Sequence, residues 1–441
     1  MKVNNKKIII NLILILVFIL PFNFYYIFNF STIKEVLFFK ETLQYSIYAF
    51  DIVFLFILFF WLKEKIKNNS IEKFIKNNWF LWLLVFYFLF NSFFVSLNPF
   101  SSLYNSLRIL EVLVFFLILV NTIKSKKFLE KIFSVIFISG IIQSIIAFFQ
   151  FIFQKSLGLK YLGETVLSPQ ILGIAKIEDN GEKFIRAYGT FPHPNLLGIF
   201  LFLSLFCGIY LFLHNKKFKT PALKFFLPLC FFIILIGILL TFSRSIWLIT
   251  FLLGLTIILR YSKNLFKPDF RIKNSVIYIF IIFSFTVIIL LVFSKVISIR
   301  ICYQNCQDQS LIFREIYLNF SQKIIQNNFL TGIGIGQFTS FFKEINPYNL
   351  PEWNLQPVHN FYLLITSELG IIGLLLLIFF IISKISFSFF KKSLLEFLFV
   401  AFLFVAFFDH YFWTLPQGQF IFWLTLALLT SSSRIKEVIK K

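Results

Sequence analysis

The chain has 441 residues, of which 59% are hydrophobic, and its mean hydropathy is +0.85. This composition excludes an ordinary water-soluble domain, because a soluble fold cannot hide so much apolar surface. Its 42 lysines and arginines against 20 acidic residues give a net charge of +22, a balance that also occurs in nucleic-acid-binding proteins. The positions of those charges along the chain decide between a nucleic-acid-binding surface and a signal of membrane orientation.

Apolar runs of about 17–25 residues recur along the whole chain, and each is long enough to cross the hydrocarbon core of a bilayer. We predict an all-α fold: a polytopic integral membrane protein with about twelve transmembrane helices in a single transmembrane helical domain, residues 1–441. The predicted spans are roughly 8–30, 44–62, 79–97, 103–122, 132–153, 195–213, 225–242, 245–260, 275–294, 359–382, 393–412 and 417–432.

The basic residues concentrate in alternate connections between these spans. If the N-terminus lies in the cytoplasm, most lysines and arginines fall on inner segments, such as 124–131 and 216–224. This is the positive-inside bias of membrane proteins, so the net charge mainly signals orientation. We predict a multi-pass protein of the bacterial cytoplasmic membrane, surrounded by membrane lipids, with no nucleic-acid partner.

Two long loops face outward in this topology, residues 155–194 and 295–358, and together they hold half of the glycines and prolines and many of the asparagine and acidic residues. Polar elaboration on one face only places the expected chemistry or recognition outside the cytoplasm. The second loop contains an amphipathic helix, lying on the membrane or on the bundle, that either serves the site or is a packing lid. Its predicted apolar face consists of Ile312, Phe313, Ile316, Phe320 and Ile324.

Cys302 and Cys306 lie in the second loop. Their spacing permits a disulfide in an oxidising compartment if the turn is tight, and equally permits two free thiols. No histidine pair accompanies them, so a metal site is not predicted.

Three arginines stand at the outer boundary: Arg186, Arg244 and Arg314. A guanidinium group binds phosphate through two parallel hydrogen bonds, where lysine offers only a point charge. Arg244 follows Ser243 between two spans with almost no loop, so it either binds an anion or snorkels at a helix end. Arg186 begins RAYGTFPHPN, whose Asn195 we expect as the N-cap of the next helix. This segment either adds backbone donors for a phosphate or only caps the helix.

His359 and Asn360 stand where the second loop enters an apolar helix. A histidine titrates near neutral pH and can take a proton from a hydroxyl, although at this position it can also be only an interfacial residue. We expect His359, Gly370 and Gly373 to share one stripe of a continuous helix, where glycines let a neighbouring helix or a lipid chain approach. Glu368 would lie on the opposite face and be a poor partner for His359.

Three further groups carry polar or glycine-rich patterns. Arg108 and Glu111, three residues apart in one predicted span, should form a buried ion pair. The segment TGIGIGQF at 331–338 lacks the GxGxxG spacing, which favours a flexible turn or a surface of close approach over a phosphate loop. Asp409 and His410 close a span near the outer face, where they either orient part of the site or form a structural polar cluster.

These segments together resemble the O-antigen ligase / polysaccharide polymerase family of bacterial membrane proteins. The resemblance spans roughly 100–430, and the first hundred residues match only in hydropathy. The matching segments are RAYGTFPHPN at 186–195, TFSRSIW at 241–247, FREIYLNF with TGIGIGQF at 313–338, HNFYLLITSELGIIG at 359–373 and DHYFWTLPQGQF at 409–420.

The resemblance implies a fold related to the membrane-embedded GT-C glycosyltransferases. It implies transfer of a glycan from undecaprenyl pyrophosphate to a hydroxyl of a glycan or lipid acceptor on the outer face, without ATP, another cofactor or a divalent metal. Carried over by motif, Arg244, Arg314 and Arg186 would hold the pyrophosphate, and His359 would be the general base or orient the acceptor. Direct displacement would invert the anomeric centre. Ser243, Asn360, Asn195, Gly370 and Gly373 would support these groups.

The alternative is a flippase for lipid-linked glycans or a polysaccharide exporter. Transporters of this kind commonly show internal repeats and polar residues at the bilayer midplane. Here the polar groups cluster at the outer edge, and we find no convincing repeat. A membrane assembly subunit without activity would leave the arginines and His359 unexplained. The sequence therefore favours the transferase and does not separate ligase from polymerase.

Overall fold

The computed structural model describes residues 5–28, 45–179, 182–214, 221–262, 309–351, 354–385 and 394–440. The chain divides into two compact units. The first unit comprises residues 1–20, 25–129 and 308–441, and the second comprises residues 21–24 and 130–307. The predicted span 275–294 and the pair Cys302 and Cys306 lie outside the described residues.

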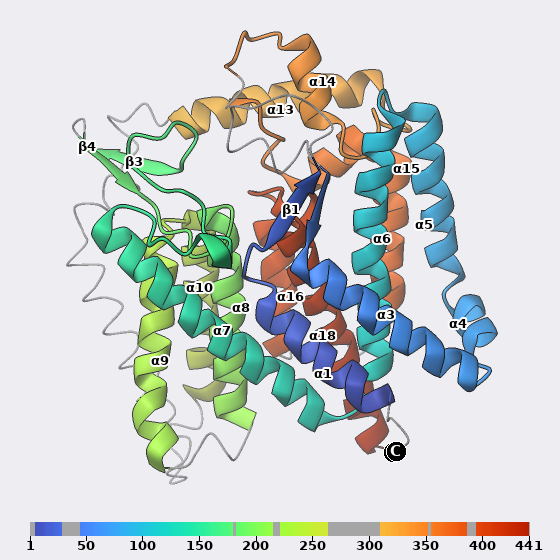
Figure 1. Cartoon of the computed structure of the whole chain (residues 1–441), viewed down its shortest axis with the longest axis vertical. Coiled ribbons are helices and arrows are strands. Elements are labelled where there is room, and N and C mark those ends of the chain that lie inside the picture. Colours follow the sequence, from blue (N-terminus) through green and yellow to red (C-terminus); the bar gives the residue numbers. More distant parts are fainter. Residues whose placement is uncertain are drawn as a thin grey trace. The chain divides into compact units, whose positions relative to one another are not determined.

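The first unit is mainly helical (Figure 1). Its N-terminal part contains α1 (Asn5–Ile19), β1 (Tyr25–Phe28), β2 (Tyr45–Tyr48), α3 (Ala49–Lys67), α4 (Ile71–Asn77), α5 (Trp79–Phe90), the π-helical turn η1 (Asn91–Val95) and α6 (Pro99–Thr122). Its C-terminal part contains α13 (Gln309–Asn327), α14 (Phe338–Ile345), α15 (Phe361–Lys384), α16 (Leu394–Val405), α17 (Tyr411–Thr414) and α18 (Pro416–Lys440). Helix α18 packs along α6, so the two parts share one core.

The second unit contains most of α7 (Lys126–Phe153) and the helices that pack with one another after the first loop. Its other elements are the 3₁₀ turn η2 (Lys160–Leu162), β3 (Lys176–Asp179), β4 (Glu182–Ile185), α8 (Pro194–His214), α9 (Pro221–Leu240) and α10 (Arg244–Ser262). Helix α8 packs against both α9 and α10, and most of its residues are buried. A helix that is apolar on all sides takes such a central place.

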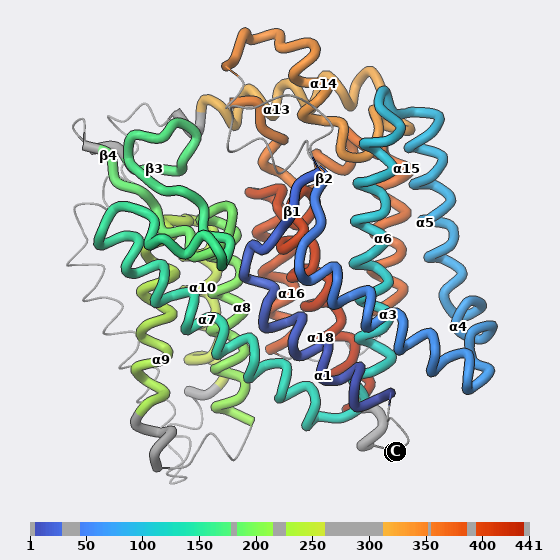
Figure 2. Tube along the Cα trace, viewed as in Figure 1, coloured from blue at the N-terminus to red at the C-terminus, as the bar shows by residue number. Residues whose placement is uncertain are grey.

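Four helices in the described ranges are long and apolar enough to cross a membrane: α6, α7, α8 and α15. Helices α4 and α5 add a fifth candidate if they form one span, which is bent by 72° (Figure 2). These segments make the chain an integral membrane protein by length and composition. They fall on the predicted spans 79–97, 103–122, 132–153, 195–213 and 359–382.

The predicted all-α fold agrees with the mainly helical structure, with two local differences. Strand β1 pairs antiparallel with β2, with Tyr25 opposite Tyr48, and β3 pairs antiparallel with β4. The second half of the predicted span 8–30 is also wrong as a helix, because α1 ends at Ile19 and β1 follows. Pro21 stands at this point and has no N–H to continue the helical hydrogen bonds.

Helix α6 begins where the sequence supplies two independent signals. The Asn98 side chain accepts a hydrogen bond from the Ser101 N–H at 3.1 Å, and Pro99 occupies the first helical position. Proline loses nothing there, since the first N–H of a helix has no partner within it. This start sets the register that places Arg108 on the inner side of the unit.

The predicted amphipathic helix of the second loop is confirmed as α13, which lies across one end of α15 (Figure 1). Its buried face is partly different from the predicted one. Tyr317 and Ser321 are buried together with Phe320 and Ile324, whereas Ile312 is 50% exposed. Tyr317 and Ser321 are tolerated on this buried face because their hydroxyls have hydrogen-bond partners there, the Asn354 carbonyl and the Ser367 hydroxyl.

Candidate functional site

The first unit brings His359 to the start of α15, where Asn360 is the N-cap. The Asn360 side chain accepts hydrogen bonds from the N–H groups of Tyr362 and Leu363, both at 3.0 Å. The Phe361 N–H also donates to the Ala406 carbonyl at 2.8 Å, just beyond α16. Asn360 therefore caps the helix. The bond between Phe361 and Ala406 holds His359 beside the segment that leads to His410.

The imidazole of His359 lies between two other rings. The Tyr317 ring of α13 stacks almost parallel on it, with ring centroids 5.8 Å apart and planes at 9°. The His410 ring meets it edge-on, with centroids 5.0 Å apart and planes at 90°. Two rigid neighbours on different elements fix the orientation of the predicted base, as a reacting imidazole requires.

His410 is buried between α16 and α17, and its Nδ1 lies 2.8 Å from the Thr414 hydroxyl. Burial, and next the positive charge of Arg314, lower the pKa of His410 to about 3. His410 is therefore neutral at pH 7, and Arg314 supplies positive charge to this cluster. No group of three or more His, Cys, Asp or Glu side chains suited to a metal ion occurs in the described ranges.

Helix α13 carries Arg314 and Tyr317 on adjacent turns and is tied to the rest of the unit at two points. The Tyr317 hydroxyl donates to the Asn354 carbonyl, and the Ser321 hydroxyl lies 2.9 Å from the Ser367 hydroxyl of α15. Burial raises the pKa of Tyr317 well above its usual value, so its hydroxyl stays protonated and continues to donate. The unit thus gathers Arg314 and His359, two of the predicted site residues, around His410.

The expectation that α15 is one continuous helix is wrong at Gly370. This residue has φ 65° and ψ −176°, outside the helical region. A Cβ there would lie 2.1 Å from the Leu330 carbonyl oxygen, so only glycine fits. The break resets the helical register, and Gly370 and Gly373 therefore do not share a simple stripe with His359.

The break in α15 pairs with the glycine-rich segment 331–338 and the residues before it. The N–H of Ile333 donates to the Ser367 carbonyl at 3.0 Å, and the N–H of Ile371 donates to the Phe329 carbonyl at 2.9 Å. Interrupted helices at membrane depth need such partners for their freed backbone groups. The predicted close-approach role of the segment is confirmed. Its Gly332, for example, would place a Cβ 2.4 Å from the Glu368 backbone.

Glu368 is the polar residue whose role the sequence missed. Its buried carboxylate accepts hydrogen bonds from the N–H groups of Gly336 at 2.8 Å and Phe338 at 3.2 Å, and from the Trp413 indole at 2.7 Å. Three donors on one carboxylate compensate for its burial. The acidic residue itself was a signal in the sequence, because an ionisable group inside an apolar helix is expected to have specific hydrogen-bond or charge partners.

In the second unit, Arg186 is buried and holds two segments together. Its Nε donates to the Thr241 carbonyl at 2.7 Å, and its Nη2 donates to the Asn195 side chain. The expectation that Asn195 is the N-cap of α8 is wrong. The helix begins at Pro194, and the N–H of Asn195 donates to the His193 ring at 3.1 Å. Proline is pre-organised for the first helical position, so the helix begins at Pro194 rather than after Asn195.

Ser243 and Arg244 follow Thr241 at the tight connection between α9 and α10. Phe242 has φ 48°, the left-handed conformation that lets the chain reverse within a few residues. Ser243 is buried and precedes α10, and Arg244 is the exposed first residue of that helix. Arg244 thus stands at the positive end of a helix dipole, with Arg186 bracing the carbonyl just before the turn.

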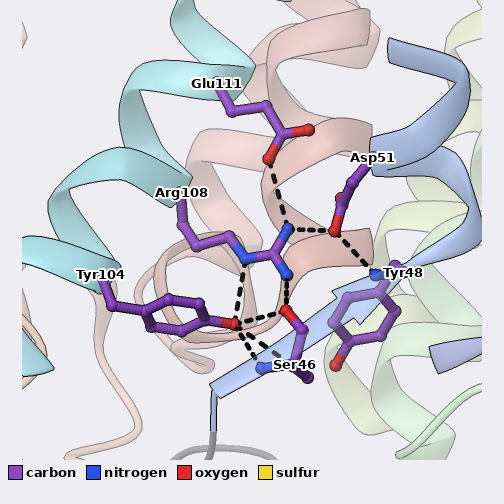
Figure 3. Close-up of polar contacts among 6 residues, drawn as sticks. All are labelled: Ser46, Tyr48, Asp51, Tyr104, Arg108 and Glu111. Atoms are coloured by element: carbon purple, nitrogen blue, oxygen red, sulfur yellow. Dashed lines mark hydrogen bonds and ion pairs between the residues drawn. The ribbon is translucent and has the colours of Figure 1, made fainter. Parts of the chain in front are cut away.

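A second polar cluster of the first unit centres on Arg108 (Figure 3). Its Nη1 lies 2.5 Å from the Asp51 carboxylate and 3.2 Å from that of Glu111, and its Nε donates to the Tyr104 hydroxyl at 3.1 Å. Its Nη2 donates to the Ser46 carbonyl. The predicted pair of Arg108 and Glu111 is confirmed, and Asp51 from α3 is an additional partner.

Residues 229–378, about a third of the chain, match the family model described as O-Antigen ligase. This segment is similar to the O-antigen ligase family. The match supports an O-antigen ligase or polymerase role, with glycosyltransferase-like activity on lipid-linked glycans. It contains seven of the residues predicted for the site: Ser243, Arg244, Arg314, His359, Asn360, Gly370 and Gly373. No curated protein matches the chain.

Proposed function

We propose that the protein transfers a glycan from undecaprenyl pyrophosphate to an acceptor hydroxyl at the outer face of the bacterial cytoplasmic membrane, as an O-antigen ligase or a surface-polysaccharide polymerase. The observation that carries this proposal is the cluster in which His359 lies against His410 and His410 lies in the field of Arg314. His359, a candidate base, contacts His410, and the charge of Arg314 acts on His410; His359 and Arg314 both belong to the segment matched to the O-antigen ligase family.

The arginines supply the electrostatic part of the reaction. Cleavage of the glycosyl–phosphate bond builds negative charge on the leaving pyrophosphate, and guanidinium groups stabilise it best where water is scarce. We assign Arg314 and Arg244 to this charge. Arg244 is suited to it because the N-terminus of the 19-residue helix α10 adds its own positive potential. Two N–H groups of Arg186 already donate hydrogen bonds within the second unit. We therefore assign Arg186 a role in positioning the Thr241 and Asn195 segments, in addition to its predicted contact with the pyrophosphate.

His359 supplies the proton transfer. It accepts the proton of the acceptor hydroxyl as the oxygen forms a bond to the anomeric carbon, while the bond between that carbon and the pyrophosphate oxygen breaks. Undecaprenyl pyrophosphate leaves with the bonding electron pair. A single displacement of this kind inverts the anomeric centre and needs no metal ion. Because His410 is neutral, it adds no positive charge that would disfavour protonation of His359.

The test uses the full-length protein in nanodiscs, supplied with the lipid-linked glycan donor and the acceptor of the host cell. We expect His359→Ala to lower transfer roughly 100- to 10,000-fold, the usual contribution of a general base. Arg244→Lys should lower it about 10-fold or more, since lysine keeps the charge and loses the two-point contact. Gel mobility of the acceptor reports new glycosidic bonds.

The matched controls are His214→Ala and Arg260→Lys. His214 lies in the last turn of α8, stacked on Tyr210, and Arg260 is exposed near the end of α10. Both variants should transfer at the wild-type rate. Full activity of His359→Ala would contradict the base assignment. Movement of lipid-linked glycan across vesicles without a new glycosidic bond would support a flippase instead.

A further inference from the structure

The first unit contains an open pocket that the proposed reaction does not use. Its empty space is about 630 Å³, which includes space open to solvent. The lining comes from β2, α6, α14 and the residues just before it, α15 and the residues just before it, α17 and α18. Six of the lining residues carry the argument that follows: Arg108, Thr339, Glu368, Trp413, Thr414 and Gln419.

We propose that this pocket binds a neutral sugar residue of the glycan substrate. The inference rests on the proposed function, since it names the part of the glycan that the transferase would bind near His359 and His410. A hydroxyl-rich sugar offers both donors and acceptors and has apolar faces that lie against an aromatic ring. The mixture of Trp413 with hydroxyl and amide side chains in the lining matches that chemistry.

The charges of the pocket argue against an anionic ligand. Arg108 is already engaged by the Asp51 and Glu111 carboxylates, so its positive charge is compensated (Figure 3). The other ionisable lining residue, Glu368, is an acid, and its carboxyl oxygens accept three hydrogen bonds from the protein. A phosphate would meet no available positive charge among these groups, whereas a neutral sugar meets no repulsion.

Gln419 supplies an independent sign that the pocket takes a polar ligand. It is 4% exposed and lines the pocket, and its Nε2 donates to the Trp413 carbonyl. Among the described residues its Oε1 has no hydrogen-bond partner. A buried acceptor left without a donor costs free energy, so such a group commonly serves a ligand or a water molecule. A sugar hydroxyl would supply the donor.

The pocket also connects to the histidine cluster. Thr414 lines it, and the Thr414 hydroxyl lies 2.8 Å from His410 Nδ1. His410 in turn contacts the ring of His359. A sugar held in the pocket is therefore two side chains away from the proposed base, a suitable place for the unit next to the reacting one.

The sugar can come from the acceptor or from the donor glycan, and the experiment separates the two. Full-length protein in nanodiscs is titrated with two probes: the delipidated acceptor oligosaccharide of the host, and the donor glycan released from its pyrophosphate lipid. Binding is followed by saturation-transfer NMR. Gln419→Leu and the isosteric Thr339→Val should each weaken one probe about 5- to 10-fold, the usual effect of one lost hydrogen bond. Gln322→Leu, an exposed glutamine of α13, is the matched control.

The outcomes decide the proposal. Weakening of one probe by both substitutions supports it and names the source of the sugar. Unchanged binding in both variants, or no binding of either probe, overturns it, and so does displacement of the sugar by inorganic pyrophosphate. His359→Ala separates this proposal from the proposed function. That variant should lose transfer and keep sugar binding, and normal transfer with sugar binding intact would remove the catalytic assignment alone.

Discussion

The ring of His410 meets the ring of His359 edge-on, with centroids 5.0 Å apart and planes at 90°. His359 precedes α15 and His410 follows α16, and the bond from the Phe361 N–H to the Ala406 carbonyl brings these two places together. His410 is itself fixed by the Thr414 hydroxyl. It is therefore suited to orient the His359 imidazole.

Replacement of His410 by alanine should lower kcat about 10- to 100-fold through loss of this orientation. His410→Asn should recover most of the activity, because an amide near the position of Nδ1 can still bond to the Thr414 hydroxyl and stays uncharged. Steady-state transfer kinetics measure both variants, and KM for the donor should change little. Equal activity of the alanine and asparagine variants would contradict the positioning role.

The stability of the first unit should fall in acid because of His410. Its pKa is lowered from 6.5 to about 3 in the fold, so below pH 6.5 the unfolded chain binds a proton that the folded chain excludes. Between these two values the free energy of unfolding should decrease by up to ~1.4 kcal/mol per pH unit from this group alone. The unfolding temperature measured from pH 7.5 to 5 should drop more steeply in the wild type than in His410→Asn. Parallel curves would rule out His410 as the source.

Much of the candidate site follows from the sequence, because arginine and histidine are rare at the edge of a membrane protein and each needs a reason to be there. The contact partners do not follow in the same way. From the sequence alone, His410 either orients part of the site or belongs to a structural polar cluster. No local pattern predicts that the ring of His410 contacts the ring of His359. The role of Tyr317 could not be predicted, because its ring fits an apolar helix face and the sequence does not show which group its hydroxyl bonds to.

The fold shows the same division. Apolar length predicts helices such as α6, α7 and α8 well, since a long apolar run has few alternatives in a membrane. The break in α15 could not be read from periodicity, because Gly370 is compatible with a helix and the deciding contact is with the distant Leu330 carbonyl. The short strands were missed for a related reason, as pairing depends on residues far apart in the chain.

Gly370→Ala should destabilise the first unit. An added Cβ would lie 2.1 Å from the Leu330 carbonyl oxygen, and alanine disfavours the φ of 65° found there. We expect a loss of about 2–4 kcal/mol in the free energy of unfolding, combining backbone strain and the clash. Gly254→Ala in α10 is the control, because nothing lies within 4 Å of its added Cβ. Thermal unfolding in detergent should separate the two variants, and equal stability would contradict the assigned break.

Glu368→Gln should loosen the glycine-rich segment 331–338. The carboxylate accepts two hydrogen bonds on Oε2 and one on Oε1. The NH₂ of a glutamine would therefore face the N–H groups of both Gly336 and Trp413, or that of Phe338. The expected cost is about 2–4 kcal/mol, with faster amide exchange confined to this segment and the start of α14. Hydrogen-exchange mass spectrometry measures it. Glu315→Gln on the exposed side of α13 is the control and should leave the exchange rates unchanged.

Arg108→Met should be among the most destabilising substitutions in the first unit. Arg108 is the positive member of a buried cluster, and its removal leaves the Asp51 and Glu111 carboxylates close together without compensation. Breaking a buried ion pair in this way costs about 3–5 kcal/mol. Neutralising all three residues at once, as Arg108→Met with Asp51→Asn and Glu111→Gln, should restore most of the unfolding temperature, because the loss comes from unpaired charge rather than from the missing side chain. If the triple variant is no more stable than Arg108→Met, packing around the guanidinium is the larger contribution and the electrostatic account of the cluster is wrong.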